Sequence, residues 1–373
     1  MNKIMLGKVK DKSLKLNLQF FADKGSTIYQ LVTPKEIGTY YTEGSSNRIP
    51  YLGETLFPAK KQMGLDLKWI KGSSGLPVAL KPSAFDVGTV LRDRVGFDEL
   101  ETEMPFFKEG TLIKEKDRQE LNKIMASGNQ AYIDMIIGKI FDDVNGLISG
   151  AKVQAERMIM QLLSTGKIGI SANKLNYDYD YKFLAGHTET LLATAKWSDV
   201  ENSNPVDDIE RWMDAVEDTT GQRPSKAICT KKTWNYIKQN KKIKLDMNPI
   251  GGHNIIMTDA LLEQYLENKL GLKIAKYNKK FKSEAGVSTQ FFPDDVFTLI
   301  PDGPLGNLYY GTTPEESDLM SGATSAEVSI VDTGVAVTTE KKTDPVNVFT
   351  KVSAIMLPSF ESIDSVFIAK VNG

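Results

Sequence analysis

The sequence predicts an α+β protein, and three observations support that class. Residues 130–165 repeat apolar side chains every three or four positions, the spacing of one face of an α-helix. Residues 65–70 alternate apolar and polar side chains and lead into a glycine-rich turn, which is typical of a β-hairpin. Residues 199–313 alternate helical and strand patterns, so they predict an α/β lobe.

The helix predicted over residues 130–165 is the longest element of the chain. Asn129 suits its N-cap and Gly166 suits the position after its last residue. At ~1.5 Å per residue it would run roughly 54 Å, so we expect a spine that outspans a small domain. Three glycines, each costing about 1 kcal/mol relative to alanine, suggest that another backbone approaches the helix: Gly138, Gly146 and Gly150.

The composition is that of an ordinary soluble globular protein. The chain has 373 residues, room for two or three domains, with 41% hydrophobic and 25% charged residues. Its formal net charge of −2 gives no global attraction to nucleic acid, so any DNA contact must come from local patches. We expect no signal peptide and no membrane span, because no run of about 18 apolar residues occurs.

Few residues favour catalysis or metal binding, and we expect no catalytic residue, cofactor or metal site. The single cysteine, Cys229, excludes an intramolecular disulfide and a multi-thiolate metal site, and its apolar surroundings predict a buried, inert thiol. The two histidines, His187 and His253, lie too far apart in sequence for a typical zinc motif.

The first residues form a basic arm. Residues 1–24 hold six lysines and two aspartates, a local charge of +4 without the chain terminus. Alternating apolar residues within the arm predict a strand with one apolar face: Leu14, Leu16, Leu18 and Phe20. An arm this short has nothing of its own to cover that face, so it either stays disordered or contacts a neighbour.

The hairpin predicted near residue 70 cannot be stable alone. Its first strand, residues 65–70, alternates Leu65, Leu67 and Trp69 with polar residues, and residues 76–80 provide the return strand with Leu76 and Leu80. A lone hairpin is marginal in water, so its apolar face needs the chain's own body or another subunit. Opposed charges follow and could orient subunits, although such clusters are usually solvated: Arg92, Arg94, Glu99, Glu101 and Glu103.

The remaining elements follow from caps and turns. Helices are predicted at 116–126, at 205–219 after Asn204, at 231–239 after Thr230, and at 259–270 between Thr258 and Gly271. Strands are predicted at 175–183, 225–229, 272–277, 288–293, 296–300, 306–310, 329–331 and 335–339, and a strand-rich ending spans 348–371. Residues 314–326 are polar and predict a surface loop.

Two segments resemble functional motifs, one of a protease and one of a nucleic-acid-binding protein, but each also has a purely structural interpretation. Asp332, Thr333 and Gly334 follow an apolar strand as in an aspartic protease, which would need a symmetric dimer, but a hairpin turn with a left-handed Gly334 fits better. Lysines from Lys226 to Lys244 interleave with aromatic residues and could contact nucleic acid. A solvated helix face with the aromatics turned inward is the preferred interpretation.

Several segments together resemble the major capsid proteins of tailed bacteriophages, in particular the phage lambda-like capsid protein E family. They include ETLFPAKKQMGLDLKWIKGSSGLPVAL, RDRVGF, EMPFF, QLLSTGKI, WSDVENSNPVDDIERW, FFPDDVFTLIPDG, LYYG and VTTEKKTDPVNVFTKVSAIMLPSFESIDSVFIAKV. The resemblance runs from about residue 28 to the end, and the order and spacing of the segments carry it. The lysine-rich first residues through LNLQFFA depart from the family pattern.

The resemblance implies the tailed-phage major capsid (Johnson) fold. Its parts would be an N-terminal arm (1–44), an extended E-loop hairpin and its base (45–110), a P-domain with the spine helix (111–198), an α/β A-domain (199–339) and a C-terminal return to the P-domain (340–373). Contacts between subunits are then expected at Leu65, Leu67, Trp69, Leu76, Leu80, Arg92, Arg94, Glu99 and Glu101, with the arm contributing Leu14, Leu16, Leu18 and Phe20.

The implied function is structural. The resemblance implies a non-enzymatic head protein that forms hexamers and pentamers of an icosahedral shell, is assembled in the host bacterial cytoplasm and becomes part of the virion. Implied partners are portal, scaffold and decoration proteins, and packaged double-stranded DNA bound through its phosphates. Alternatives are a cellular nanocompartment shell of the same fold, a dimeric aspartic protease using Asp332, and a nucleic-acid-binding protein using Lys226 to Lys244.

Overall fold

The computed structural model describes most of the chain from residue 33 onward. The described residues are 33–45, 50–71, 98–126, 130–172, 174–251, 255–283, 286–322, 326–344 and 346–373. Predictions that lie outside them concern the arm residues Leu14, Leu16, Leu18 and Phe20, and the loop residues Leu76, Leu80, Arg92 and Arg94.

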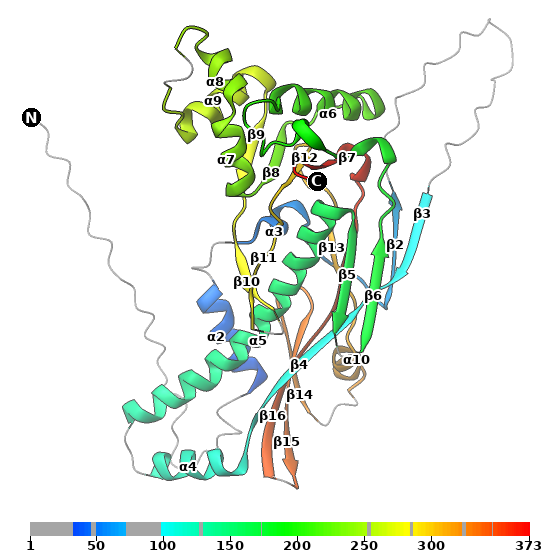
Figure 1. Cartoon of the computed structure of the whole chain (residues 1–373). Helices are drawn as coiled ribbons and strands as arrows, with labels where there is room; N and C mark the ends of the chain where they lie inside the picture. Colours follow the sequence, from blue (N-terminus) through cyan, green and yellow to red (C-terminus); the bar gives the residue numbers. More distant parts are fainter. Residues whose placement is uncertain are drawn as a thin grey trace, which may run out of the picture.

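A long sheet forms the lower part of the molecule in Figure 1. Its strand order is β1 (Ala59–Lys61), β13 (Leu308–Tyr310), β16 (Val346–Pro358), β15 (Val335–Thr343) and β14 (Glu327–Val331). Farther down, β4 (Phe106–Ile113) replaces β13 as the neighbour of β16. Because β16 pairs with β15 along one side and with two strands on the other, it is the central strand of this sheet.

An upper lobe contains a second, five-stranded sheet. Its order is β7 (Thr188–Thr190), β17 (Phe367–Lys370), β12 (Val296–Ile300), β8 (Lys226–Cys229) and β9 (Lys273–Lys276). Its helices are α6 (Pro205–Thr220), α7 (Lys231–Gln239), α8 (Lys241–Met247) and α9 (Asp259–Leu270), with short 3₁₀ turns η2 (Ala185–His187), η3 (Ala193–Ala195) and η5 (Ile363–Ser365) nearby. Trp197 and Trp212 stack at 5.7 Å between ring centroids in its core.

The spine helix α5 (Gln130–Thr165) has the bounds that the sequence predicts. Gly166 follows it with φ +75°, a conformation that favours glycine. Its apolar stripe is buried against the long sheet and β5 (Lys167–Ala172) through residues that include Ile137, Val144, Ile148, Met158 and Leu162.

The three glycines of α5 do not have the neighbour that the sequence suggested. A Cβ atom added at Gly138, Gly146 or Gly150 would meet nothing within 4 Å. The prediction of a backbone packed against them is therefore wrong for the described chain. Glycine content alone does not distinguish a close backbone contact from an open helix face.

Capping residues explain several helix boundaries. Thr230 and Thr258 accept hydrogen bonds from the backbone amides of Thr233 and Leu261, and these bonds satisfy N-terminal donors of α7 and α9 as predicted. Asn204 occupies the N-cap position of α6, but its side chain donates to Asp207 and caps no backbone amide.

The loop predicted at 314–326 is wrong at its beginning, because α10 (Pro314–Ser321) is a helix. Thr313 caps it by accepting from the amide of Glu316, and proline stands at the first helical position. The capping signal was present in the sequence, but the polar composition of the segment hid it. α10 then lies beside β14 and β15.

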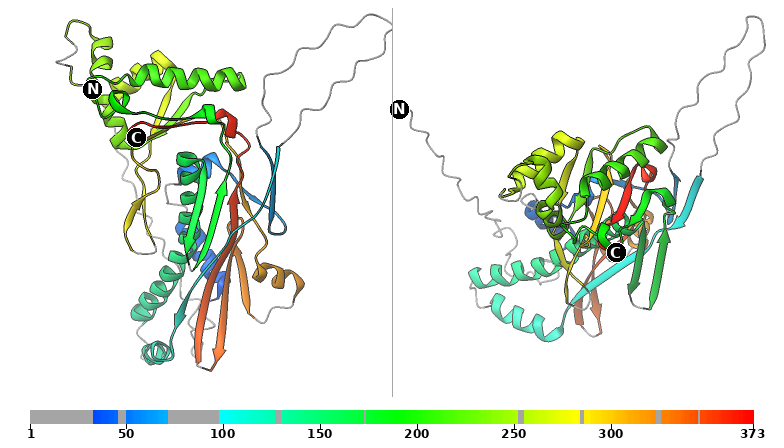
Figure 2. Two further views of the ribbon diagram at one scale, coloured as in Figure 1. Left: turned by 45° about the vertical axis from the view of Figure 1, so that its right-hand side comes forward. Right: turned by 45° about the horizontal axis from the view of Figure 1, so that its top comes forward.

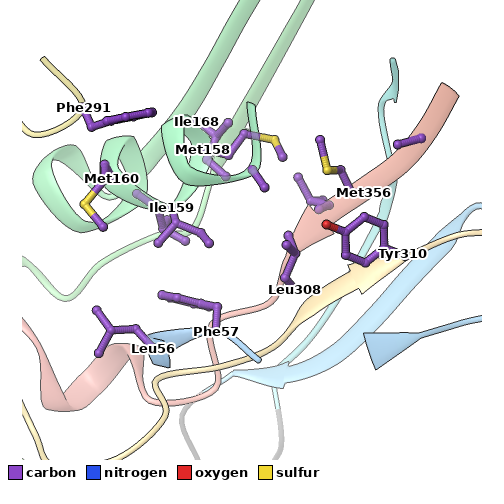
Figure 3. Packing of buried hydrophobic residues seen from close by; sticks show 14 of the residues in the cluster. Leu56, Phe57, Met158, Ile159, Met160, Ile168, Phe291, Leu308, Tyr310 and Met356 are labelled. Atoms are coloured by element: carbon purple, nitrogen blue, oxygen red, sulfur yellow. The ribbon is translucent and has the colours of Figure 1, made fainter. Parts of the chain in front are cut away.

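The central core lies where α3 (Leu52–Leu56), α5 and β13 meet. Figure 3 shows Leu56 and Phe57 pointing toward Ile159, with Leu308 and Tyr310 on the neighbouring strand. All five are buried. Burying an aliphatic or aromatic side chain contributes about 1.5–3 kcal/mol, so this cluster firmly joins the segment before the hairpin to the spine.

Two further ribbons and the flanking helices complete the fold. β5 pairs with β6 (Leu175–Asp180), and β10 (Lys280–Lys282) pairs with β11 (Ser288–Gln290). The helices α2 (Pro34–Ser45) and α4 (Glu115–Ala126) lie beside α5. Within the described ranges, no helix combines the length and apolarity needed to cross a bilayer.

Candidate inter-subunit surface

A two-stranded ribbon extends along one flank of the molecule (Figures 1 and 2). β2 (Asp66–Lys71) pairs antiparallel with β3 (Asp98–Glu103), from Asp66 opposite Glu103 to Lys71 opposite Asp98. The sequence predicted residues 76–80 as the return strand, and the described partner of β2 is instead β3. Residues 72–97, which connect the two strands, lie outside the described residues. Sequence patterns identify a return strand by the short turn before it, and a connection of this length provides no such turn.

The inward face of this ribbon packs on its own subunit. Leu67 is 0% exposed and Trp69 is 8% exposed. The Trp69 ring lies 5.4 Å from that of Tyr181, whose hydroxyl donates to the carbonyl of Pro358 at 2.5 Å. The sequence predicts Leu67 and Trp69 as anchors on a neighbouring subunit. Both side chains are covered by their own chain and so orient the ribbon, while their contact with a neighbouring subunit stays a prediction.

The edge of the same ribbon keeps exposed apolar surface. Leu65 is 44% exposed, and Met63, in the preceding turn, is 77% exposed. Gly64 between them adopts φ +87°, and the amide of Met104 donates to the carbonyl of Leu65 at 2.9 Å. Among the predicted contact residues Leu65, Leu67 and Trp69, Leu65, just before β2, is therefore the one whose side chain is available to a partner.

The predicted charged contacts are only partly described. Glu99 and Glu101 lie in β3 opposite Ile70 and Lys68, so their backbone positions belong to the ribbon. Their side chains lie outside the described residues, as do Arg92 and Arg94. Their participation in contacts between subunits stays a prediction.

A second exposed apolar feature, on the upper lobe, was missed by sequence reasoning. Ile250 is 99% exposed and Ile256 is 86% exposed, although the loop that carries Ile250 is ordered by hydrogen bonds. The Asn248 side chain accepts from the amides of Ile250 and Gly251 at 3.3 and 3.0 Å. An isoleucine in an otherwise polar turn was the available signal, because aliphatic side chains presented this fully suit a binding partner.

A buried carboxylate joins three elements at the centre of the molecule. Glu156 of α5 accepts hydrogen bonds from the Gly53 amide of α3 at 2.9 Å and from the Tyr277 hydroxyl, beyond β9, at 2.5 Å. Burial raises the pKa of Glu156 to about 7, and Glu54 adds to the increase, while both hydrogen bonds and Lys279 oppose it. Sequence reasoning missed this residue, since a single glutamate beside a helical stripe usually faces solvent.

A half-open cavity of about 210 Å³ adjoins Glu156. Its walls include the apolar side chains of Phe57 and Ile159, and its polar lining comes from Lys152, Glu156 and Asp332, among others. Lys152 forms an ion pair with Asp332 at 3.2 Å.

The protease interpretation is not supported by this arrangement. Residues 332–334 form the turn between β14 and β15, which confirms the predicted hairpin. The left-handed residue is Asp332, at φ +52°, whereas Gly334 is needed because a Cβ there would lie 2.6 Å from Tyr310. An aspartic protease shares a proton between two carboxylates, but the ion-pair partner of Asp332 is an ammonium group.

The basic and aromatic segment of the upper lobe, Lys226 to Lys244, makes its described contacts within its own chain. Four of its lysines form ion pairs within the chain: Lys226 with Asp302, Lys232 with Asp295, Lys238 with Asp259, and Lys241 with Glu201. Trp234 is 1% exposed, so its ring is closed to a stacking base. The structure thus supports a solvated face with an inward aromatic.

The remaining side chains that could take part in catalysis or metal binding are buried or lie far apart. Cys229 is buried, as predicted, and burial raises the pKa of its thiol to about 12. In the part of the chain that the structure describes, no group of three or more His, Cys, Asp or Glu residues is placed to hold a metal ion.

Solved structures of phage origin share this fold. A phage-related protein of Bordetella bronchiseptica RB50 is 12% identical, with a TM-score of 0.54 over 91% of this chain and 97% of that chain. A prophage protein of E. coli CFT073, described as a capsid protein, is 17% identical, with a TM-score of 0.55 over 91% and 99% of the two chains. The fold, with its spine helix, flanking ribbon and upper lobe, is that of tailed-phage head proteins.

The family follows from the sequence itself. The family model described as phage major capsid protein E matches residues 39–371, and the chain belongs to this family. A comparison with curated proteins finds no match. The protein is a major capsid protein, a structural component of the phage head, and this confirms the resemblance seen in its segments.

Proposed function

We propose that copies of this chain assemble through hexamers and pentamers into the icosahedral shell of a tailed bacteriophage that encloses double-stranded DNA. The observation that carries the proposal is the match of the phage major capsid protein E family across residues 39–371. The role is structural, with no catalytic step assigned to any residue.

The physical basis is a set of surfaces that a single subunit leaves uncovered. Met63 and Leu65 beside the ribbon, and Ile250 and Ile256 on the upper lobe, expose apolar area in turns and loops of the described chain. Heterologous contacts between identical subunits close into rings, so one sequence can cover such surfaces repeatedly. Interface energy concentrates in a few buried anchors, for which Leu65 and Ile250 are our candidates.

Partners beyond the chain itself follow from the same proposal. Portal, scaffold and decoration proteins would meet the shell, and the inner surface would meet DNA phosphates without reading bases. Assembly would take place in the host bacterial cytoplasm. The N-terminal arm, with its six lysines in residues 1–24, is our candidate for part of this polyanion contact.

A cellular nanocompartment of the same fold is the second candidate, and the family match favours the phage shell. Electron microscopy of the chain, purified or co-expressed with scaffold and portal proteins, tests the proposal. Uniform closed shells are the expected result, and DNA inside particles matured in the host separates a phage head from a compartment filled with protein. A preparation containing only monomers or dimers would overturn the proposal.

A further inference from the structure

Two short ribbons lie on opposite flanks of the molecule. Figures 1 and 2 show β2–β3 on one flank and β10–β11 on the other, with α5 between them. Each ribbon is a separate two-stranded sheet among the described residues. A subunit that meets its neighbours head to tail around a ring presents opposite flanks to the two neighbours.

The outward face of the β2–β3 ribbon is predominantly acidic: by the register it holds the positions of Asp66, Glu99, Glu101 and Glu103, with one lysine, Lys68, opposite Glu101. Asp66 and Glu103 are exposed and stand directly opposite each other in the register. Like charges opposite each other on a sheet face are destabilising. Within the described residues neither carboxylate forms an ion pair, and Glu101 lies two residues from Glu103 in the same strand. The repulsion between the Asp66 and Glu103 carboxylates is relieved if a cationic surface covers this face of the ribbon.

The outward face of the β10–β11 ribbon is basic. Lys280 and Lys282 are exposed and lie two residues apart, opposite Gln290 and Ser288. Phe281 between them faces the body, with its ring 4.8 Å from Phe291. The described residues of this hairpin, 279–283 and 286–290, contain no carboxylate, and Glu284 lies outside them.

The two faces also match in spacing. Positions two apart on a strand are separated by roughly 6.6 Å, since a strand rises about 3.3 Å per residue. The carboxylate positions 101 and 103 in β3 and the lysines of β10 share this interval. The two lysines thus have the spacing of two acidic positions on the ribbon. Because Glu101 stands opposite Lys68 of its own chain, the described acceptors of the contact are the exposed Asp66 and Glu103.

We infer that the acidic face of the β2–β3 ribbon docks on the basic β10–β11 ribbon of a second copy of this chain. The inference rests on the proposed function, because it supplies one of the contacts that close a ring of subunits. Charge complementarity sets the register of the contact and speeds encounter, while the exposed Leu65 and Met63 beside it supply apolar area.

Zero-length cross-linking of the assembled wild-type protein tests the contact directly. A carbodiimide joins a carboxylate to an amine only when the two are in contact. Mass spectrometry should find peptides carrying Asp66 or Glu103 joined to peptides carrying Lys280 or Lys282, and mixed isotope-labelled subunits should show that the link is between chains. Shells without this link would overturn the inference and leave the proposed function standing. Absence of shells would instead count against the proposed function.

Charge reversal gives an independent test. D66K/E103K and K280E/K282E should each reduce the fraction of protein in shells about tenfold or more, and the fourfold variant should recover most of it. K174E/K231E, which changes two exposed lysines elsewhere, should assemble like the wild type. Circular dichroism of each variant establishes that it is folded. If folded reversal variants assemble normally, or the fourfold variant assembles no better than either pair, the contact does not exist.

Discussion

The hydroxyl of Tyr277 donates to the carboxylate of Glu156 at 2.5 Å, and this bond links the upper lobe to the spine helix. The same carboxylate accepts from the Gly53 amide, so one buried group holds three segments far apart in sequence. Its burial makes the junction sensitive to ionisation. The geometry of the shell subunit thus depends on a residue that touches no predicted interface.

The first prediction concerns pH. The pKa of Glu156 is raised from 4.5 to about 7, so the folded state binds this proton more tightly than the unfolded state. The contribution is fully present below pH 4.5 and is lost as pH rises through about 7; at about 1.36 kcal/mol per pKa unit it amounts to about 3 kcal/mol. Glu156→Gln should flatten this part of the stability profile of the dissociated subunit, measured by denaturant unfolding between pH 4.5 and 8.

The exposed neighbour Glu54 provides the matched control for that experiment. Glu54→Gln should leave most of the pH dependence in place, because Glu54 is only a secondary cause of the raised pKa of Glu156. A Glu156→Gln variant with the same pH profile as the wild type would show that Glu156 does not titrate in this range.

The second prediction concerns the glycine beneath that carboxylate. A Cβ at Gly53 would lie 2.2 Å from Oε2 of Glu156 and 2.9 Å from Cδ1 of Ile159. Overpacking of this kind typically costs about 1–3 kcal/mol, so Gly53→Ala should lower the free energy of unfolding by that amount. Gly138→Ala, where the added atom meets nothing, should instead raise it by up to about 1 kcal/mol. Equal effects at the two positions would contradict the packing described at Gly53.

The third prediction separates orienting residues from contact residues in the ribbon. Trp69→Ala removes a buried ring and should destabilise the free subunit by about 3–5 kcal/mol. Leu65→Ala should change subunit stability by no more than about 0.5 kcal/mol and should reduce assembly. Thermal unfolding of the free subunit and sedimentation of the assembled protein measure the two effects. Normal assembly of Leu65→Ala would remove Leu65 from the interface.

The fourth prediction concerns a helix cap. Thr258 accepts from the amide of Leu261, so Thr258→Ala should cost about 1 kcal/mol of stability. Thr258→Ser keeps the hydroxyl and serves as the control, with a stability close to that of the wild type. A loss as large for serine as for alanine would assign the effect to the lost methyl group instead of the cap.

Much of the fold was predictable because local chemistry dictates it. The stripe of α5 and the caps Thr230 and Thr258 mark their elements within a few residues, and the structure confirms them. The return strand of the ribbon was not predictable, because the pairing of β2 with β3 spans residues 72–97, whereas residues 76–80 offered a nearer partner.

The candidate surface was predictable only in part. Alternation in β2 identifies the apolar face that includes Trp69, but it cannot tell whether Tyr181 of the same chain or a neighbouring subunit covers it. Burial of Glu156 likewise depends on Gly53 and Tyr277, which are far away in sequence. Exposed residues such as Ile250 become visible only when the folded chain shows what it leaves uncovered.

The central claim is that copies of this folded subunit contact one another and close into a shell. Sedimentation velocity of the purified wild-type protein under assembly conditions, with electron microscopy of the same fractions, tests it most directly. The account predicts a single dominant fast-sedimenting species of closed, uniform particles. A protein that stays monomeric or dimeric at every concentration and salt condition tested, while fully folded, would contradict it.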